Sequence, residues 1–240
     1  IEGVPGPALL VVPMDMLNEA TDECLRPPPQ PVALPPARCE QINAMAAMIL
    51  AAERPIIVTD VGAARGDCHA GLNSLAHMGI PVLGNSLGRG IVPEVAPYGY
   101  PWPYAQLAAP QSDLVIVVGA KLSMWFGYGK APRFGEHAKF LHLDDNAAAI
   151  SRNVTVDLSV IAHMGDSLSL LAAQLRQSDF HRDAGWLEAA LADRSNRIDD
   201  ICAQDAQSLH QLEIGAALNQ AMPSNRLLVG DGADILNFTF

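Results

Sequence analysis

The segment DLVIVVG, residues 113–119, decides the fold. It places five consecutive aliphatic residues between an aspartate and a glycine, a run too short for a helix and typical of a strand buried on both faces. Shorter apolar runs that predict strands are found at residues 56–59, 81–83, 139–143 and 158–162. Such strands are typical of a parallel sheet that is covered by helices on either side.

The segments between these runs predict helices at residues 40–52, 69–78 and 166–176, and a short helical turn at residues 147–151. Short strands that alternate with helices imply right-handed parallel crossovers. The sequence therefore predicts an α/β fold, a doubly wound Rossmann-like parallel sheet, over residues 37–177.

The remaining segments of this region are expected to be irregular. Residues 60–67 (DVGAARGD) predict a glycine-containing turn, and residues 86–110, with many glycines and prolines, predict a loop-rich segment. Residues 26–36 (RPPPQPVALPP) cannot sustain a helix or a central strand, so they predict an extended linker and a domain boundary. Ahead of the linker, the apolar run within residues 7–13 predicts a short strand.

Beyond residue 177 the pattern changes. Residues 184–207 predict a charged helix, residues 210–222 a second helix and residues 226–229 a strand that opens another α/β domain. Because the chain begins at Ile1 in what reads as the end of a segment, and closes on a strand and turn, we expect it to be part of a longer polypeptide.

The composition excludes some classes of partner. The 240 residues are 50% hydrophobic and 17% charged, which is an ordinary globular composition. The net charge of −11 and a pI of about 4.9 disfavour binding to a phosphate backbone. No apolar run approaches the ~20 residues that a membrane helix needs. We therefore expect neither nucleic-acid nor membrane partners.

Cysteine and histidine spacing gives no metal or catalytic motif. The four cysteines, Cys24, Cys39, Cys68 and Cys202, form no C-x-x-C pair, so free thiols and a reducing cytoplasm are expected rather than zinc or iron–sulfur ligation. The seven histidines form no spaced cluster. No catalytic and no metal-binding residue is therefore assigned.

Turns after the expected strands are candidate ligand sites, because parallel sheets bind ligands at the carboxyl edge. The turn Asp60-Val61-Gly62-Ala63 has an aspartate where a phosphate-binding turn has its first glycine, which favours a structural turn over a ligand site. The turn Gly119-Ala120-Lys121 places Lys121 to meet an anion, and a solvated surface lysine is an equally good interpretation.

Two further turns lie at the same expected edge. Asp144 ends a strand, where it can accept hydrogen bonds from a ribose or cap the next helix, and Asp145 is an equally good N-cap. Asn85-Ser86 with Gly88-Arg89-Gly90 would let a ligand approach the backbone, or is a mobile connecting loop. Alone, these turns indicate a nucleotide-binding fold without specifying a function.

The order of several segments carries a resemblance. These are GPALLVVPMDML, PIIVTDVGAA, NSLGRGIVP, SDLVIVVGAKLSMWFGYGKAPRFGEHAKFLHLDDNAAAISRN and LLVGDGADILN. Their succession resembles the thiamine-diphosphate-dependent enzyme superfamily along nearly the whole chain. It is most similar to oxalyl-CoA decarboxylases and 2-hydroxyacyl-CoA lyases, and then to acetolactate synthases. The segment VGAKLSMWFGYG resembles the GARLNW segment of the acyl-CoA enzymes.

The resemblance implies a three-domain subunit. Residues 1–25 would end the pyrimidine-binding domain, residues 26–36 would be the linker, and residues 37–177 would form the central, nucleotide-binding-like domain. Residues 178–209 would be a connector, and residues 210–240 would begin the diphosphate-binding domain.

In the family the central domain holds ADP or the CoA nucleotide in acyl-CoA enzymes and FAD in acetolactate synthases. Asp60 replaces a glycine of the family pattern and Lys121 replaces an arginine, and both changes disfavour a nucleotide. By position, the residues that would line this site are Gly62, Ala63, Asn85, Gly119, Ala120, Lys121 and Asp144.

The resemblance also implies how thiamine diphosphate is held. The contacts with its diphosphate end would come from Asp231, Gly232, Ala233 and Asp234, where Asp234 replaces the usual Asn or His. The glutamate that activates the cofactor and the Asp and Asn that bind Mg²⁺ would lie in parts of the domains outside these residues.

The implied function is that of a thiamine-diphosphate-dependent C–C bond lyase or carboligase. It would act on 2-oxo or 2-hydroxy acids or their CoA thioesters, as a homodimer or homotetramer, because the cofactor sites lie between subunits in this superfamily. The alternatives are an acetolactate synthase with FAD and a non-catalytic nucleotide-binding Rossmann-like module.

Overall fold

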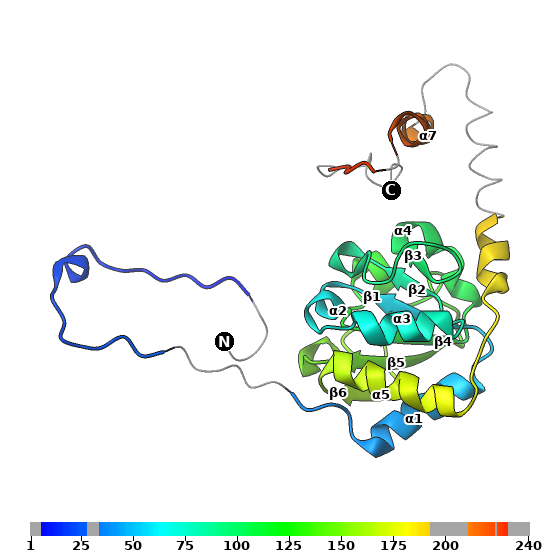
Figure 1. Ribbon diagram of the computed structural model, residues 1–240, viewed down its shortest axis with the longest axis horizontal. Coiled ribbons are helices and arrows are strands. Elements are labelled where there is room, and N and C mark those ends of the chain that lie inside the picture. The colour runs from blue at the N-terminus through cyan, green and yellow to red at the C-terminus, as the bar shows by residue number, and fades with distance from the viewer. Residues whose placement is uncertain (1–5, 28–33, 193–210, 224, 230–240) are drawn as a thin grey trace.

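A parallel six-stranded sheet forms the centre of the protein. The computed structural model describes residues 6–27, 34–192, 211–223 and 225–229. The strand order is β3-β2-β1-β4-β5-β6, and every neighbouring pair is parallel (Figure 1). The strands are β1 (Pro55–Thr59), β2 (Val82–Gly84), β3 (Gly99–Pro101), β4 (Leu114–Val118), β5 (Lys139–Asp144) and β6 (Leu158–Ile161). The predicted α/β fold with a doubly wound parallel sheet is confirmed.

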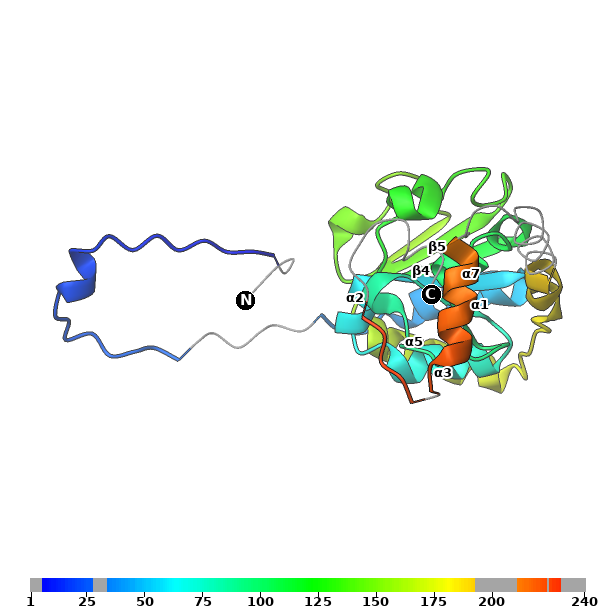
Figure 2. The same ribbon diagram turned by 90° about the horizontal axis from the view of Figure 1, so that it is seen from above.

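Helices within residues 39–192 cover both faces of the sheet. The α-helices are α1 (Cys39–Ala51), α2 (Val61–Arg65), α3 (His69–His77), α4 (Trp102–Ala105), α5 (Met164–Gln177) and α7 (Gln211–Ala221), and residues 185–192 are also helical. Short 3-10 helices are η1 (Met16–Asn18), η2 (Ser86–Gly88), η3 (Ala109–Gln111), η4 (Met124–Gly129) and η5 (Ala147–Ala149). Figure 2 shows α1, α3 and α5 together on one side of the sheet.

Two hydrophobic cores lie on the two faces of the sheet. Along β1, Ile57 faces the core under α1, α3 and α5, whereas Ile56 and Val58 face the opposite core. Helix α1 lies on the first core because its apolar residues recur at helical spacing, and Met45 and Ile49 on that stripe are fully buried. Burying one such side chain contributes ~1.5–3 kcal/mol, so these contacts help to hold α1 on the sheet.

The prediction of a strand near each end of the chain is wrong. Residues 7–13 and 226–229 form no strand, and Leu9 and Leu10 are 91% and 85% exposed. A strand exists only where a neighbour accepts and donates its backbone hydrogen bonds, and no described residue pairs with either segment. Their apolar sequence is therefore not sufficient to make them strands.

One prediction of irregular structure is wrong, and a second is incomplete. Residues 60–67 contain helix α2 instead of a simple turn, and the loop-rich residues 86–110 also contain β3, α4, η2 and the start of η3. Strand β3 consists of Gly, Tyr and Pro, and the propensities of Gly and Pro argue against a strand. It forms because it pairs with β2 at the edge of the sheet.

Some residues of the expected connector pack against the sheet. Phe180 is buried in the core under α1, α3 and α5, and Leu187 and Leu191 are buried in the opposite core. The Arg182 guanidinium donates to the carbonyls of Ala52 and Leu50 at 2.9 and 2.8 Å. Residues 180–191 are therefore packed against the sheet, past the expected boundary at residue 177. In the linker, residues 34–36 have no regular structure, and residues 28–33 lie outside the described part.

Candidate functional site

The candidate site is the carboxyl edge of the sheet, where β1 and β4 lie side by side. The chain leaves β1 towards the face covered by α3, and it leaves β4 towards the opposite face, where Phe126 and Phe134 are buried. Ligands of open α/β sheets bind at such a change of direction. The structure brings the turns that begin at Asp60, Asn85, Gly119 and Asp144 to this edge, since they follow β1, β2, β4 and β5.

Gly62 and Gly119 are in direct backbone contact across this edge. The Gly62 N–H donates to the Gly119 carbonyl oxygen at 2.9 Å. A Cβ atom on Gly62 would lie 2.6 Å from that oxygen, and one on Gly119 would lie 2.2 Å from the Ala63 nitrogen. Gly119 also has a φ of +56°, which favours glycine. These glycines are explained by the close approach of two backbone segments.

Other backbone N–H groups of the expected site are bonded within the protein. Ala63 N donates to Asp60 O at 3.0 Å, Asn85 N donates to Thr59 O at 2.9 Å, and Gly119 N donates to Leu143 O at 3.1 Å. The methyl groups of Ala63 and Ala120 are buried in the two hydrophobic cores. These residues of the expected lining therefore stabilise the turns themselves.

Asp60, Asn85 and Lys121 form the polar group at this edge. Burial raises the pKa of Asp60 above its usual range, against the opposing effects of a Val61 N–H bond, a bond from the Asn85 side chain and the charge of Lys121. The oxygen Oδ1 of Asp60 is buried and accepts no hydrogen bond from the described residues. The sequence assigns Asp60 to a structural turn, and its burial could not be read from that position.

Asp144 is used by the turn that follows β5. Its Oδ1 accepts a hydrogen bond from Asn146 N at 2.8 Å, and its Oδ2 lies 3.6 Å from His142 Nε2. Of the two proposed roles, the structure does not contain the cap, because Asn146 is the N-cap of η5, and the role of ribose acceptor stays a prediction. Asp145 is not the N-cap, because Asn146 occupies that position and accepts from Ala148 N at 3.0 Å.

Sequence reasoning misses His142, a buried residue inside β5. Only 1% of the residue is exposed, and neither ring nitrogen has a hydrogen-bond partner among the described residues. It lies two residues before Asp144, so both side chains point to the same face of the strand. A histidine between leucines in the run FLHL is the only signal for it in the sequence.

The glycine-containing loop after β2 contains an ion pair between Arg89 and Glu94. Arg89 donates to both carboxylate oxygens of Glu94, at 2.8 and 2.7 Å. Such a paired geometry holds the Arg89 side chain in place. Gly88 N donates to Asn85 O at 2.7 Å, which closes the 3-10 turn η2. In the structure this loop is thus fixed by its own contacts.

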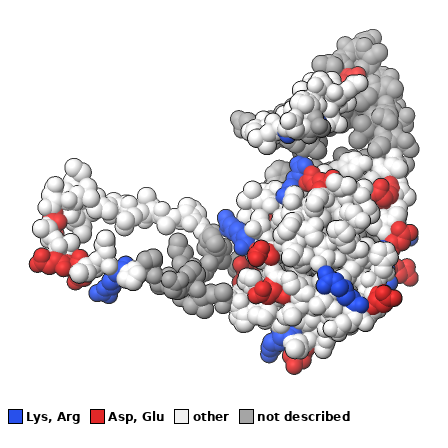
Figure 3. Space-filling view, in the orientation of Figure 1, with Lys and Arg blue, Asp and Glu red and all other residues white. Residues whose placement is uncertain are grey.

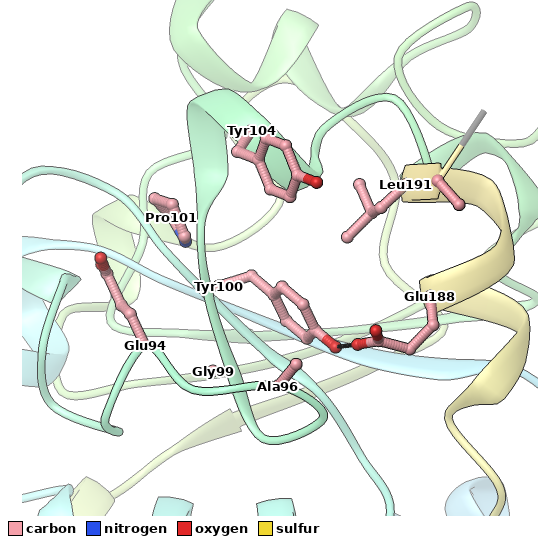
Figure 4. Close-up of a pocket in the computed structure, with 9 residues that line it drawn as sticks. Glu94, Ala96, Gly99, Tyr100, Pro101, Tyr104, Glu188 and Leu191 are labelled. Carbon is pink, nitrogen blue, oxygen red and sulfur yellow. Dashed lines mark hydrogen bonds between the residues drawn. The ribbon is translucent and has the colours of Figure 1, made fainter. Parts of the chain in front are cut away.

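A cavity of about 340 Å³ lies elsewhere, beside edge strand β3 (Figure 4). Its polar lining includes Glu94, Tyr100, Tyr104 and Glu188, and the Tyr100 hydroxyl donates to the Glu188 carboxylate. Burial and the neighbouring Glu188 raise the pKa of Tyr100. The cavity is acidic and does not include any of the predicted site residues.

Three further features bear on the predictions. Asp231, Gly232, Ala233 and Asp234 lie outside the described residues. No helix in the described part of the chain is long and apolar enough to cross a bilayer. On the face shown in Figure 3, acidic and basic side chains are interspersed and the basic ones form no continuous surface.

Comparisons with known proteins give the family. The model of the thiamine pyrophosphate enzyme central domain matches residues 42–171. Oxalyl-CoA decarboxylase of Escherichia coli K12 is 26% identical over 251 residues, covering 99% of this chain and 44% of that enzyme. Mouse 2-hydroxyacyl-CoA lyase 1 is 21% identical over 99% of the chain and 42% of that enzyme.

A third relative matches a shorter part of the chain. Acetolactate synthase of Mycobacterium bovis is 29% identical over 201 residues, covering 78% of this chain and 31% of that enzyme. The chain thus spans less than half the length of the relatives that it matches. Because the family model covers the β1–β6 region together with most of α1 and α5, the chain belongs to the thiamine pyrophosphate enzymes and contains their central domain.

Proposed function

We propose that this chain is part of a thiamine-diphosphate-dependent C–C bond lyase or carboligase of the oxalyl-CoA decarboxylase or 2-hydroxyacyl-CoA lyase type. Its substrates would be 2-oxo or 2-hydroxy acids or their CoA thioesters. The observation that carries the proposal is the extent of similarity. The two acyl-CoA enzymes match 99% of the chain, including both flanks of the central domain, whereas the acetolactate synthase matches 78%.

The organisation of the subunit is part of this proposal. Residues 1–25 would end the pyrimidine-binding domain and residues 210–240 would begin the diphosphate-binding domain. There, residues 231–234 would contact the diphosphate end of the cofactor. Thiamine diphosphate supplies an electron sink for cleavage or formation of a bond next to a carbonyl carbon. Mg²⁺, a homodimeric or homotetrameric assembly and a cytoplasmic location belong to the same proposal.

Activity measurements test this function directly. The polypeptide that carries this chain, supplied with thiamine diphosphate and Mg²⁺, is expected to consume oxalyl-CoA or a 2-hydroxyacyl-CoA faster than pyruvate. Omission of thiamine diphosphate should abolish turnover. Preferred conversion of pyruvate to acetolactate would contradict the acyl-CoA assignment, and equal turnover without the cofactor would contradict the whole proposal.

An acetolactate synthase is the second candidate function. It is favoured by the higher identity, 29% against 26%, over the shorter aligned region. This alternative predicts bound FAD, and therefore flavin absorbance of the purified protein. Our proposal predicts a colourless protein, and a yellow protein whose flavin is stoichiometric would favour the alternative.

A further inference from the structure

The carboxyl edge of the central sheet differs from a site for a nucleotide diphosphate in its backbone donors. Folds of this kind hold a diphosphate with unpaired N–H groups in the turns after the strands. Here the N–H groups of Gly62, Ala63, Asn85 and Gly119 donate to carbonyl oxygens of the protein, at 2.9 to 3.1 Å. A diphosphate held by these four N–H groups would have to displace bonds that the fold already makes.

The space between β1 and β4 is closed as well. The backbones of Gly62 and Gly119 are so close that a single Cβ on either would lie 2.2 to 2.6 Å from the other segment. A phosphate oxygen is larger than the hydrogen atoms that glycine presents there. Entry of a ligand between these two turns therefore requires them to separate, with loss of the bond between Gly62 N and Gly119 O.

The charges at this edge also oppose an anion. Asp60 lies beside the turn, and the hydrogen bonds and Lys121 around it do not offset its own desolvation, since its pKa is raised. Arg89, which follows β2, is already paired with Glu94. A negative charge placed beside Asp60 would be repelled by its carboxylate. Surroundings that stabilise one carboxylate poorly are not suited to a diphosphate.

We infer that the carboxyl edge of this central domain is closed to nucleotide diphosphates, because the Gly62–Gly119 contact seals it and Asp60 stands beside it. The inference goes beyond the proposed function and applies to ADP, CoA and FAD alike. If the substrate is a CoA thioester, its diphosphate must then be held by another part of the enzyme.

Amide-resolved NMR of the whole chain tests this closure. ADP, CoA and FAD are titrated separately to millimolar concentrations while the amide signals of Gly62, Ala63 and Gly119 are followed. These amides are expected to exchange slowly with solvent and to keep their chemical shifts with each ligand. Binding that moves signals elsewhere but leaves these three unchanged also supports closure. Saturable shifts of these three amides with any of the three ligands would overturn it, whether or not they disappear in Lys121→Ala.

The Asp60→Asn variant separates the contact from the charge. It removes the negative charge with little change in shape, and the Gly62–Gly119 contact is retained, so its amides are still expected not to respond to ADP. A saturable response in this variant would overturn the role of the contact. The outcome can be distinguished from that of the function test. An active lyase whose edge amides keep their chemical shifts supports both proposals. An inactive protein whose edge amides keep their chemical shifts contradicts only the proposed function.

Discussion

Gly62 donates its backbone N–H to the carbonyl oxygen of Gly119 at 2.9 Å, and this bond joins the first turn of α2 to the end of β4. The two strands that precede these glycines are neighbours in the sheet, with Thr59 opposite Val118. The contact therefore continues the pairing of β1 and β4 past their last residues. Where open α/β sheets hold ligands, this sheet has a contact between two of its own turns.

Gly119→Ala is expected to destabilise the protein by about 3 kcal/mol, from the strain of a positive φ together with overpacking. The added Cβ would lie 2.2 Å from Ala63 N. The measurement is the free energy of unfolding from urea titration. Gly90→Ala is the matched control, because Gly90 has a φ of +73° but open space around it. It should cost only about 1 kcal/mol, and equal losses in the two variants would contradict the contact argument.

Asp60→Asn is expected to stabilise the protein at pH 7. The pKa of Asp60 is raised in the folded state, chiefly by burial, so the ionised carboxylate opposes folding at any pH well above that pKa. The wild-type protein should therefore gain stability relative to the variant as the pH falls through the folded-state pKa. Thermal melting of both proteins from pH 7 towards pH 4 measures this. A difference that does not change with pH would rule out titration of Asp60 as its cause.

Asp113→Ala is expected to loosen the start of the central strands. The two carboxylate oxygens of Asp113 accept hydrogen bonds from Glu53 N at 2.7 Å and Arg54 N at 2.8 Å, which tie the turn before β1 to the start of β4. Hydrogen bonds to a charged group contribute about 1.5–3 kcal/mol each, so a loss of roughly 3 kcal/mol is expected for the partly exposed pair.

A single-bond comparator calibrates this prediction. Asp157 accepts one backbone hydrogen bond, from Phe140 N at 2.8 Å, beside β5. Asp157→Ala should therefore cost about half as much in urea unfolding. If Asp157→Ala lowers the free energy of unfolding more than Asp113→Ala does, the two bonds of Asp113 do not determine how β1 and β4 are joined.

The sheet could largely be predicted from the sequence, because its central strands are buried on both faces and are therefore mostly apolar. Strand β4, LVIVV, is the clearest case. Strand β3 could not be predicted, since Gly99 and Pro101 carry no strand signal and only pairing with β2 defines it. The apolar run in residues 7–13 is the opposite case. Its sequence predicts a strand, but no described residue pairs with it.

The sequence predicts where the turns of the candidate site lie, but not that two of them are in contact with each other. The α/β pattern predicts parallel strands, whose carboxyl ends meet at one edge, so the turns at Asp60, Gly119 and Asp144 could be placed there. A glycine indicates that something approaches the backbone closely, and it does not say whether that is a ligand or another segment. Gly62 and Gly119 are far apart in the sequence, so their contact could only be found in the structure.

Cys68 is expected to resist alkylation in the native protein at pH 8, while Cys24 and Cys39 react. Burial, followed by the charges of Asp67, Asp145 and Asp144, raises the pKa of Cys68 to about 12, so its thiolate is scarce at pH 8. Cys24 and Cys39 are exposed free thiols. Iodoacetamide labelling followed by peptide mass spectrometry measures each site, and labelling in urea is the control in which Cys68 should react. The α2–α3 region packs against the first turn of α5, where Gly165 N donates to Gly66 O at 3.0 Å. Labelling of Cys68 in the native protein as fast as that of Cys39 would mean that this region opens readily to solvent, contrary to that packing.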